Sequence, residues 1–294
     1  MRIFILGLHS PIGRHLANTL IRRGHQVSGT SRAPEPAAEL TGRLGSYHNM
    51  QLGDPADPDW FQDIDAVVYL LHDHSHDAAS RNVDGIKALF QAAFSAGVPN
   101  HMFFTSYSAK PDSRSTYGAV KFELESFFRK HNQWVVRPGL VAGASGLFGT
   151  LLRLVQEFPV LPLPDGGRAP VPLVAPESVS EAVVHILERA LPPGCWNLHQ
   201  PDPVSMREVL LCMKRLTKSR CHFIPIPAIL PLCFLRFTES VGLRLPLAAD
   251  SIAAMRENRN LRRPSHLTDL GIAGPPLEEM ILRLVRTKEC GAGP

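Results

Sequence analysis

The chain has 294 residues, of which 44% are hydrophobic and 20% charged, so it is not a disordered protein and is expected to form one large core, or one core with a smaller lobe. The net charge of +4 is too diffuse for a nucleic-acid-binding protein, and we expect neither a signal peptide nor a transmembrane segment. The five cysteines form no CxxC pair, which favours reduced thiols in a cytoplasmic protein.

Strands and helices alternate through the first half of the chain. The apolar run 2–6 predicts a strand, and the spacing of apolar residues over 11–23 predicts a helix that Gly24 ends. The further expected strands are 26–30, 46–52, 66–71, 101–105 and 134–137, and the further helices are 78–96 and 115–130. This alternation predicts right-handed crossovers and a doubly wound parallel sheet, an α/β fold of Rossmann type.

The second half of the chain differs from the first in its composition and its pattern of predicted elements. Segment 159–176 is rich in Pro and Gly, which predicts a loop with at most one short strand. Beyond it we expect a strand at 195–198 and helices at 177–191, 206–216, 228–241, 248–256 and 277–285. The sequence therefore predicts a dinucleotide-binding domain over 1–165 and a smaller, mostly helical substrate lobe over 166–294, partly interleaved with the sheet.

The most apolar segment of this lobe is 224–237. It is too short to span a bilayer and is interrupted by Pro225, Pro227 and Pro231. We expect a buried helix of the substrate lobe there, and a contact with a membrane surface is the alternative.

The segment from Gly7 to Gly13 lies between the first strand and the first helix, as a dinucleotide fingerprint requires. Gly7 permits a tight turn, and Gly13 lets the helix approach the sheet. The helix N-terminus at Ser10, Pro11 and Ile12 offers N–H groups and a positive dipole to a pyrophosphate. Ser10 stands where a three-glycine fingerprint has its middle glycine, which weakens the affinity or changes the hydrogen bonding without blocking the site. A plain strand–turn–helix is the alternative.

The end of the second strand bears on the choice of coenzyme. It has no acidic residue to hold a ribose 2′-hydroxyl, whereas Ser31 and Arg32 suit a 2′-phosphate, with Arg14 as a second cation. This favours NADP over NAD, unless Arg32 is a solvated loop cation. After the third strand, Asp54 either accepts a hydrogen bond from the adenine amino group or caps a turn.

Tyr117 and Lys121 are four positions apart on a predicted helix, so their side chains share one face. The ammonium stabilises the charged phenolate and lets Tyr117 exchange a proton near neutral pH. Lys121 can also hydrogen-bond the nicotinamide ribose. Ser106, beside Thr105 at the end of the preceding strand, offers a hydroxyl that polarises a substrate carbonyl.

Taken together, these motifs resemble the short-chain dehydrogenase/reductase superfamily, in its extended or atypical branch of NAD-dependent epimerase/dehydratase type. The segments that carry the resemblance are 5–13, 65–68, 82–85, 104–106, 117–121 and 136–139. The resemblance implies that Tyr117 is the acid/base group, that Lys121 anchors the cofactor, and that Leu70, Leu71 and Pro138 lie beside it. It also implies hydride transfer at a carbonyl or alcohol carbon of a small molecule, with a nucleotide sugar or an apolar ketone as candidates, and a homodimer as in many relatives.

The chain departs from the family pattern around its hydroxyl groups. The segment before Tyr117 is short, and the family's catalytic hydroxyl position holds Tyr107, so Ser106, Thr105 or Ser108 takes the role or the role is lost. The run HDHSHD at 72–77 contains metal-ligand types, yet we interpret it as a polar active-site loop and expect no metal.

Two classes of function follow from these motifs. One is an NADP(H)-dependent oxidoreductase or epimerase/dehydratase, which includes an enzyme whose apolar substrate is bound by segment 226–237. The other is a non-catalytic dinucleotide-binding regulatory or assembly protein. Retention of both Tyr117 and Lys121 favours the enzyme.

Overall fold

The apolar runs of the first half form one parallel sheet, and every neighbouring pair in it is parallel. The structure, a computed structural model, describes residues 1–73, 75, 78–231, 253, 257–258 and 262–291. In sheet order the strands are β11 (Cys195–Leu198), β6 (Trp134–Pro138), β5 (Asn100–Phe104), β4 (Ala66–Tyr69), β1 (Arg2–Leu6), β2 (Gln26–Ser31) and β3 (Tyr47–Asn49). The central strands are buried on both faces, which is why their sequences are continuously apolar.

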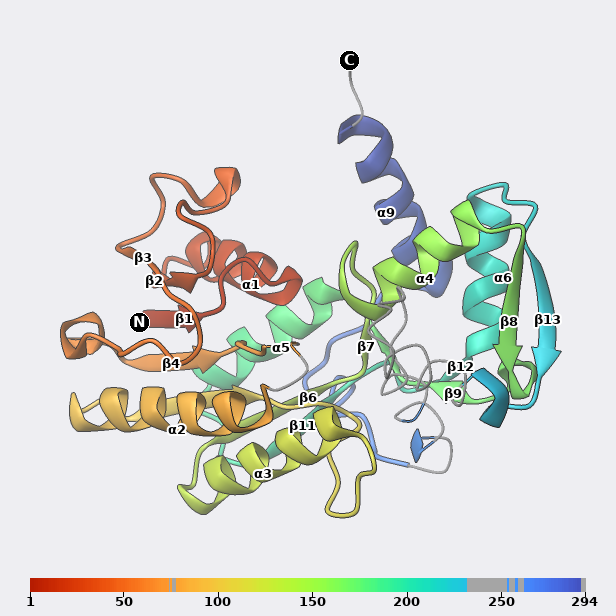
Figure 1. The fold of residues 1–294 in the computed structure, drawn as a ribbon. Helices are drawn as coiled ribbons and strands as arrows, with labels where there is room; N and C mark the ends of the chain where they lie inside the picture. Colours follow the sequence, from red (N-terminus) through yellow and green to blue (C-terminus); the bar gives the residue numbers. More distant parts are fainter. Residues whose placement is uncertain (74, 76–77, 232–252, 254–256, 259–261, 292–294) are drawn as a thin grey trace.

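Two helices cover each face of the sheet (Figure 1). Ile3 and Ile5 of β1 pack towards α1 (Pro11–Arg22) and α5 (Pro176–Glu188), while Phe4 and Leu6 pack towards α2 (Ala79–Ser95) and α3 (Thr116–Lys130). Short 3₁₀ turns lie at η1 (Ala38–Leu40), η2 (Pro58–Phe61) and η3 (Asp165–Gly167). The predicted doubly wound fold is therefore confirmed.

The strand order reverses between β1 and β4, because the chain builds the sheet outwards from β1 in both directions. In such folds the ligand crevice opens at the carboxyl ends of the strands beside this reversal. Here those ends are followed by Gly7, Leu70 and Thr105, so the predicted site residues meet at one edge of the sheet.

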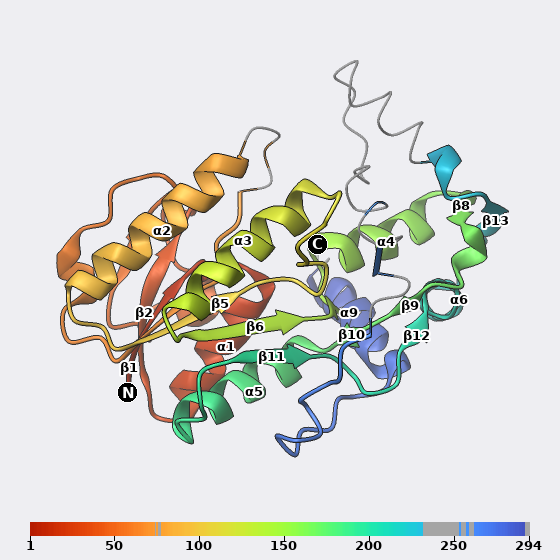
Figure 2. The same cartoon turned by 90° about the horizontal axis from the view of Figure 1, so that it is seen from below.

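A smaller lobe extends from this edge (Figure 2). Its own core is built on α4 (Gly146–Glu157), α6 (Met206–Leu216) and α9 (Leu277–Gly291). Three pairs of short strands complete it: β8 (Val160–Pro164) with β13 (His222–Ile226), β9 (Pro170–Val171) with β12 (Val204–Ser205), and β7 (Leu140–Val141) with β10 (Leu173–Val174). The division at residue 165 stays a prediction, and α5 and β11, which follow that residue in the chain, belong to the large sheet and its cover.

Two expectations for this lobe were wrong. Segment 159–176 contains β8, β9 and β10, whereas we expected at most one strand. Each of them pairs with a segment distant in sequence, so tertiary pairing outweighs the local Pro and Gly signals. The segment expected to be a buried helix from residue 224 begins instead with β13, whose Ile224 is exposed.

Most of two further expected helices lies outside the described residues: 232–241 of helix 228–241, and 248–252 and 254–256 of helix 248–256. The helix α4 was not expected, although its buried Phe148, Leu151, Leu152 and Val155 have helical spacing. Among the helices that the structure describes, none is both long and apolar enough to cross a membrane.

Candidate active site

The turn between β1 and α1 has the backbone geometry that a dinucleotide fingerprint requires. Gly7 has a φ of +104°, in the region that favours glycine. A Cβ on Gly13 would lie 2.5 Å from the carbonyl oxygen of Gly7, and a Cβ on Gly7 would lie 3.2 Å from the carbonyl carbon of Leu70. Side chains at either glycine would therefore push α1 or the end of β4 away from the turn.

Ser10 changes what the N-terminus of α1 can offer to an anion. It is the N-cap residue, and its Oγ accepts a hydrogen bond from the N–H of Gly13 at 3.0 Å. Pro11 has no N–H. The N–H of Ile12 makes no hydrogen bond within the described residues, because the first N–H groups of a helix have no acceptor in the helix itself. The serine thus uses one donor of the helix end and leaves another for a phosphate.

Ser31, predicted to contact a 2′-phosphate, is buried in a polar cluster at the end of β2. Its Oγ lies 2.5 Å from Nδ1 of His9 and 2.7 Å from the hydroxyl of Tyr47, and it accepts the N–H of Ala33 at 3.0 Å. His9 and Tyr47 were not among the predicted site residues, and the pairing of β1, β2 and β3 brings them to Ser31. The only features in the sequence that could have indicated them are the position of His9 inside the glycine turn and the position of Tyr47 in an edge strand.

The two predicted cations at this end differ. Arg14 forms an ion pair with Glu39, at 2.5 Å, which partly compensates its charge, and its contact with a 2′-phosphate stays a prediction. Arg32 is exposed and makes no ion pair or hydrogen bond with the described part of the chain. Asp54 is also exposed, and its carboxylate accepts the N–H of Gln51 at 2.7 Å, which is the turn-capping arrangement.

Tyr117 and Lys121 lie side by side at the end of β5. The helix α3 begins beneath them because Ser115 accepts the N–H of Gly118 at 3.1 Å. Lys121 is buried, its Nζ donates to the carbonyl oxygen of Phe104 at 2.9 Å, and Nζ lies 5.8 Å from the centre of the Tyr117 ring. Burial lowers the pKa of Lys121 to about 7. An ammonium that titrates near neutral pH beside a phenol can take part in proton exchange.

His72 adds a group to this pair that the sequence analysis had placed only in a polar loop. Its ring stands edge-on to the ring of Tyr117, with the centres 4.8 Å apart. The loop is fixed by Asn82, which accepts the N–H of Asp73 at 2.9 Å and donates to its carbonyl oxygen at 2.8 Å. Hydrogen bonds from Ser75 hold the pKa of Asp73 at about 2. Residues 74 and 76–77 of the metal-like run lie outside the described residues.

The hydroxyl groups beside Tyr117 have different surroundings. Thr105 donates to the carbonyl oxygen of Lys121 at 3.1 Å, and Ser108 accepts from Asn258 at 2.8 Å. Ser106 is half-buried, and its Oγ accepts the N–H of Ser108 at 3.2 Å, which leaves its own O–H proton available as a donor.

The remaining predicted residues of this region have other surroundings than Tyr117 and Lys121. The ring of Tyr107, at the family's hydroxyl position, packs on His199 with the centres 5.4 Å apart and lies 5.7 Å from the guanidinium of Arg263. Pro138 ends β6 half-buried. Leu70 and Leu71 are half-buried after β4, with Leu70 against Gly7.

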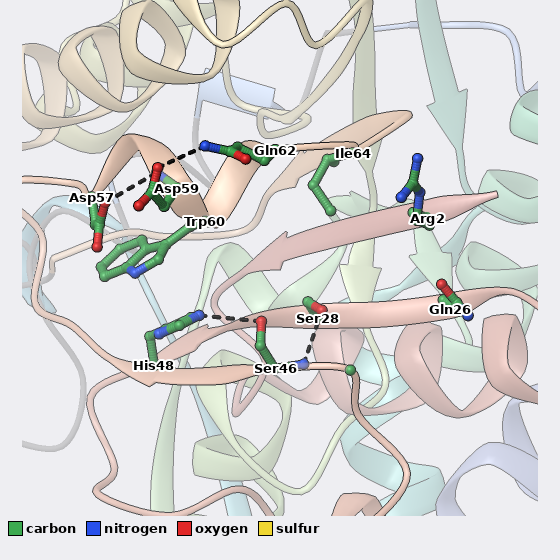
Figure 3. A pocket seen from close by; sticks show the side chains of 11 residues that line it. Arg2, Gln26, Ser28, Ser46, His48, Asp57, Asp59, Trp60, Gln62 and Ile64 are labelled. Atoms are coloured by element: carbon green, nitrogen blue, oxygen red, sulfur yellow. Dashed lines mark hydrogen bonds between the residues drawn. The ribbon is translucent and has the colours of Figure 1, made fainter.

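Two cavities flank the strands of the large sheet. One, of about 490 Å³, lies at the N-terminus of α1, between His9, Arg14 and the loop 142–145. The other, of about 520 Å³, includes the first residues of β1 and β2 and the stacked rings of His48 and Trp60 (Figure 3). Only the first borders the glycine turn, and Tyr117 and Lys121 line neither of them.

Comparison with known proteins gives a family. A family model described as the NAD dependent epimerase/dehydratase family matches residues 3–197, more than half of the chain. No curated protein sequence matches the chain.

Solved structures share the fold over almost the whole chain. A nucleoside-diphosphate-sugar epimerase from Staphylococcus aureus aligns with a TM-score of 0.77 at 14% identity, covering 96% of this chain and 100% of that one. A UDP-glucose 4-epimerase from Thermus thermophilus, in complex with NAD, aligns with a TM-score of 0.73 at 17% identity, covering 100% of both chains. An NAD-dependent NDP-hexosamine 5,6-dehydratase of tunicamycin biosynthesis aligns with a TM-score of 0.71 at 19% identity, covering 98% of each chain.

Proposed function

The chain belongs to the NAD-dependent epimerase/dehydratase family, and on this premise we propose that it transfers hydride between a nicotinamide coenzyme and an alcohol or carbonyl carbon of a nucleotide sugar. The observation that carries the proposal is the juxtaposition of Tyr117 and buried Lys121 at the same sheet edge as the glycine turn. A protein that only binds a dinucleotide has no need of this pair.

The residues at the sheet edge fit a dinucleotide. The glycine turn and the N–H of Ile12, which bonds to no described residue, suit a pyrophosphate, and the polar cluster of His9, Ser31 and Tyr47 would hold the adenosine ribose. Lys121, at the same edge, would hold the nicotinamide ribose. When bound, the coenzyme supplies the hydride acceptor and donor.

The chain's own groups then handle the proton. Tyr117 takes the proton from the substrate hydroxyl, or returns it to the carbonyl oxygen, and the ammonium of Lys121 stabilises its phenolate. Ser106 donates its O–H to the same substrate oxygen. The ring of His72 borders the Tyr117 ring edge-on.

A nucleotide sugar is the proposed substrate class because the similar structures are epimerases and a dehydratase of such compounds. To test it, UDP- and dTDP-hexoses are incubated with the protein and each coenzyme, and products are followed by NMR together with coenzyme absorbance. Conversion of at least one sugar supports the proposal. Coenzyme binding without conversion of any sugar, or of ketones of similar size, would identify the non-catalytic binder instead.

We further propose that NADP is preferred to NAD. The end of β2 offers no carboxylate, and the exposed Arg32 makes no ion pair with the described residues. Replacing Arg32 by Glu should weaken NADP binding by about 10- to 100-fold, the range of one charge-assisted contact, and change NAD binding by less than about threefold. Calorimetry with both coenzymes measures the difference.

The matched control is Arg14→Gln, in the same crevice. Because Glu39 partly compensates the charge of Arg14, this variant should change NADP binding less than Arg32→Glu does. Equal losses for NAD and NADP in Arg32→Glu would reject the proposed preference.

A further inference from the structure

The ribbon formed by β8 and β13 carries exposed apolar side chains on its outer face, beside the exposed His222. Its inner side chains, Leu161, Leu163 and Phe223, pack into the core of the small lobe. A ribbon with a core behind it ordinarily carries polar residues on its outer face. Here Val160 and Ile224 are 45% and 50% exposed.

Further exposed apolar residues lie at the two ends of this ribbon. Phe158, the residue after α4, lies two positions before β8, and Ile229 and Leu230 lie three and four positions after β13; Figure 1 shows the two strands side by side. Five of the eight large hydrophobic side chains found exposed among the described residues therefore belong to the ribbon or its ends, and we call them the ribbon face: Phe158, Val160, Ile224, Ile229 and Leu230. Apolar side chains concentrated in this way mark a contact surface.

Positive charge borders the ribbon face. Between Met206 and Ile226, five of the six charged residues are basic: Arg207, Lys214, Arg215, Lys218 and Arg220. Arg215 pairs with Glu278, and the acidic Glu208 caps α6. Lys218 and Arg220 are exposed, lead directly into β13, and make no ion pair with the described residues. The acidic residues nearest the ribbon in the sequence are Glu157 and Asp165, and Asp165 accepts the N–H of Ala228.

We propose that the ribbon face docks on the surface of an anionic lipid bilayer. Its apolar side chains would enter the interfacial region, and Lys218 and Arg220 would contact the lipid headgroups. A bilayer supplies apolar and anionic contacts together, which is the combination that this surface presents.

A second copy of the chain fits the ribbon face less well. Face-to-face docking of two copies would bring their Lys218 and Arg220 groups towards one another. Pairing along a strand edge is opposed by Pro162, Pro164 and Pro225, which lack the N–H groups that a further strand would need. The inference concerns a surface away from Tyr117 and is independent of the proposed reaction.

The test uses the full chain and sedimentation with two kinds of vesicle. One contains phosphatidylcholine alone, and the other contains phosphatidylcholine with one third phosphatidylglycerol. We expect binding to the anionic vesicles at least tenfold stronger than to the neutral ones, and weaker binding at high salt. Two double variants, Val160→Ser/Ile224→Ser and Lys218→Glu/Arg220→Glu, should each bind the anionic vesicles at least tenfold more weakly than the unchanged protein.

Matched controls are Phe94→Ser, an exposed aromatic on α2, and Lys130→Glu, at the end of α3; both should bind vesicles as the unchanged protein does. The charge variant alters only exposed side chains and keeps the test decisive if the apolar variant does not fold. Absence of binding to anionic vesicles, or equal losses in the controls, overturns the proposal. So does a dimer in gel filtration that Ile224→Ser dissociates, because a second copy would then cover the face.

Discussion

Replacing Tyr117 by Phe should lower kcat for the nucleotide sugar that the protein converts by about 10² to 10⁴, the range of a positioned acid/base group. The substitution removes one oxygen and keeps the ring, so the packing of His72 and the position of Lys121 are preserved. Coenzyme affinity should stay within about twofold, because the hydroxyl is not among the groups proposed to hold the dinucleotide. Steady-state kinetics with calorimetry of the coenzyme separates the two effects.

Tyr107→Phe is the matched control for this prediction. Tyr107 occupies the family's hydroxyl position, but its ring packs on His199 and beside Arg263 in the junction with the substrate lobe. We expect kcat to change by less than about threefold. Full activity in Tyr117→Phe would contradict the assigned role, and a large loss in Tyr107→Phe alone would move the proton-exchanging role to that residue.

Replacing Glu125 by Ala should lower the free energy of unfolding by about 3–5 kcal/mol. Glu125 is fully buried on α3, where Arg137 of β6 donates through Nε at 2.8 Å and through Nη2 to its other oxygen. The same guanidinium approaches Asn197 of β11 at 3.4 Å. Removing the carboxylate leaves a guanidinium, itself only 11% exposed, without its counter-charge between α3 and two strands. Urea unfolding followed by circular dichroism measures the loss.

Glu123→Ala provides the control on the same helix. Glu123 pairs with Lys87 at 2.7 Å, but its side chain is 54% exposed, so the loss should be at most about 1 kcal/mol. The double variant Glu125→Leu/Arg137→Met should recover much of the stability of Glu125→Ala, because it removes both charges. If Glu123→Ala and Glu125→Ala lower the free energy of unfolding by similar amounts, burial of the Glu125–Arg137 pair does not govern its contribution to stability.

The ends of several elements could be predicted because their signals are local. Gly7 and Gly13 mark the first turn through backbone geometry that few other residues adopt. The helix α6 has the bounds predicted, 206–216, and both its apolar period and its capping box are local features. Likewise, the spacing of Tyr117 and Lys121 by itself places them on one face of α3, and the structure brings Nζ of Lys121 to the Tyr117 ring.

The strand–helix alternation, the glycine turn and the Tyr–Lys pair could be predicted from the amino-acid order, since hydrophobic period, turn chemistry and helical spacing act over a few residues. Long-range packing instead sets which short strands pair in the small lobe, the contacts of Ser31 with His9 and Tyr47, and the contact of His72 with Tyr117. These contacts join segments 16 to 62 residues apart. Their free energy depends on partners that no local window contains, so neither propensity nor periodicity could reveal them.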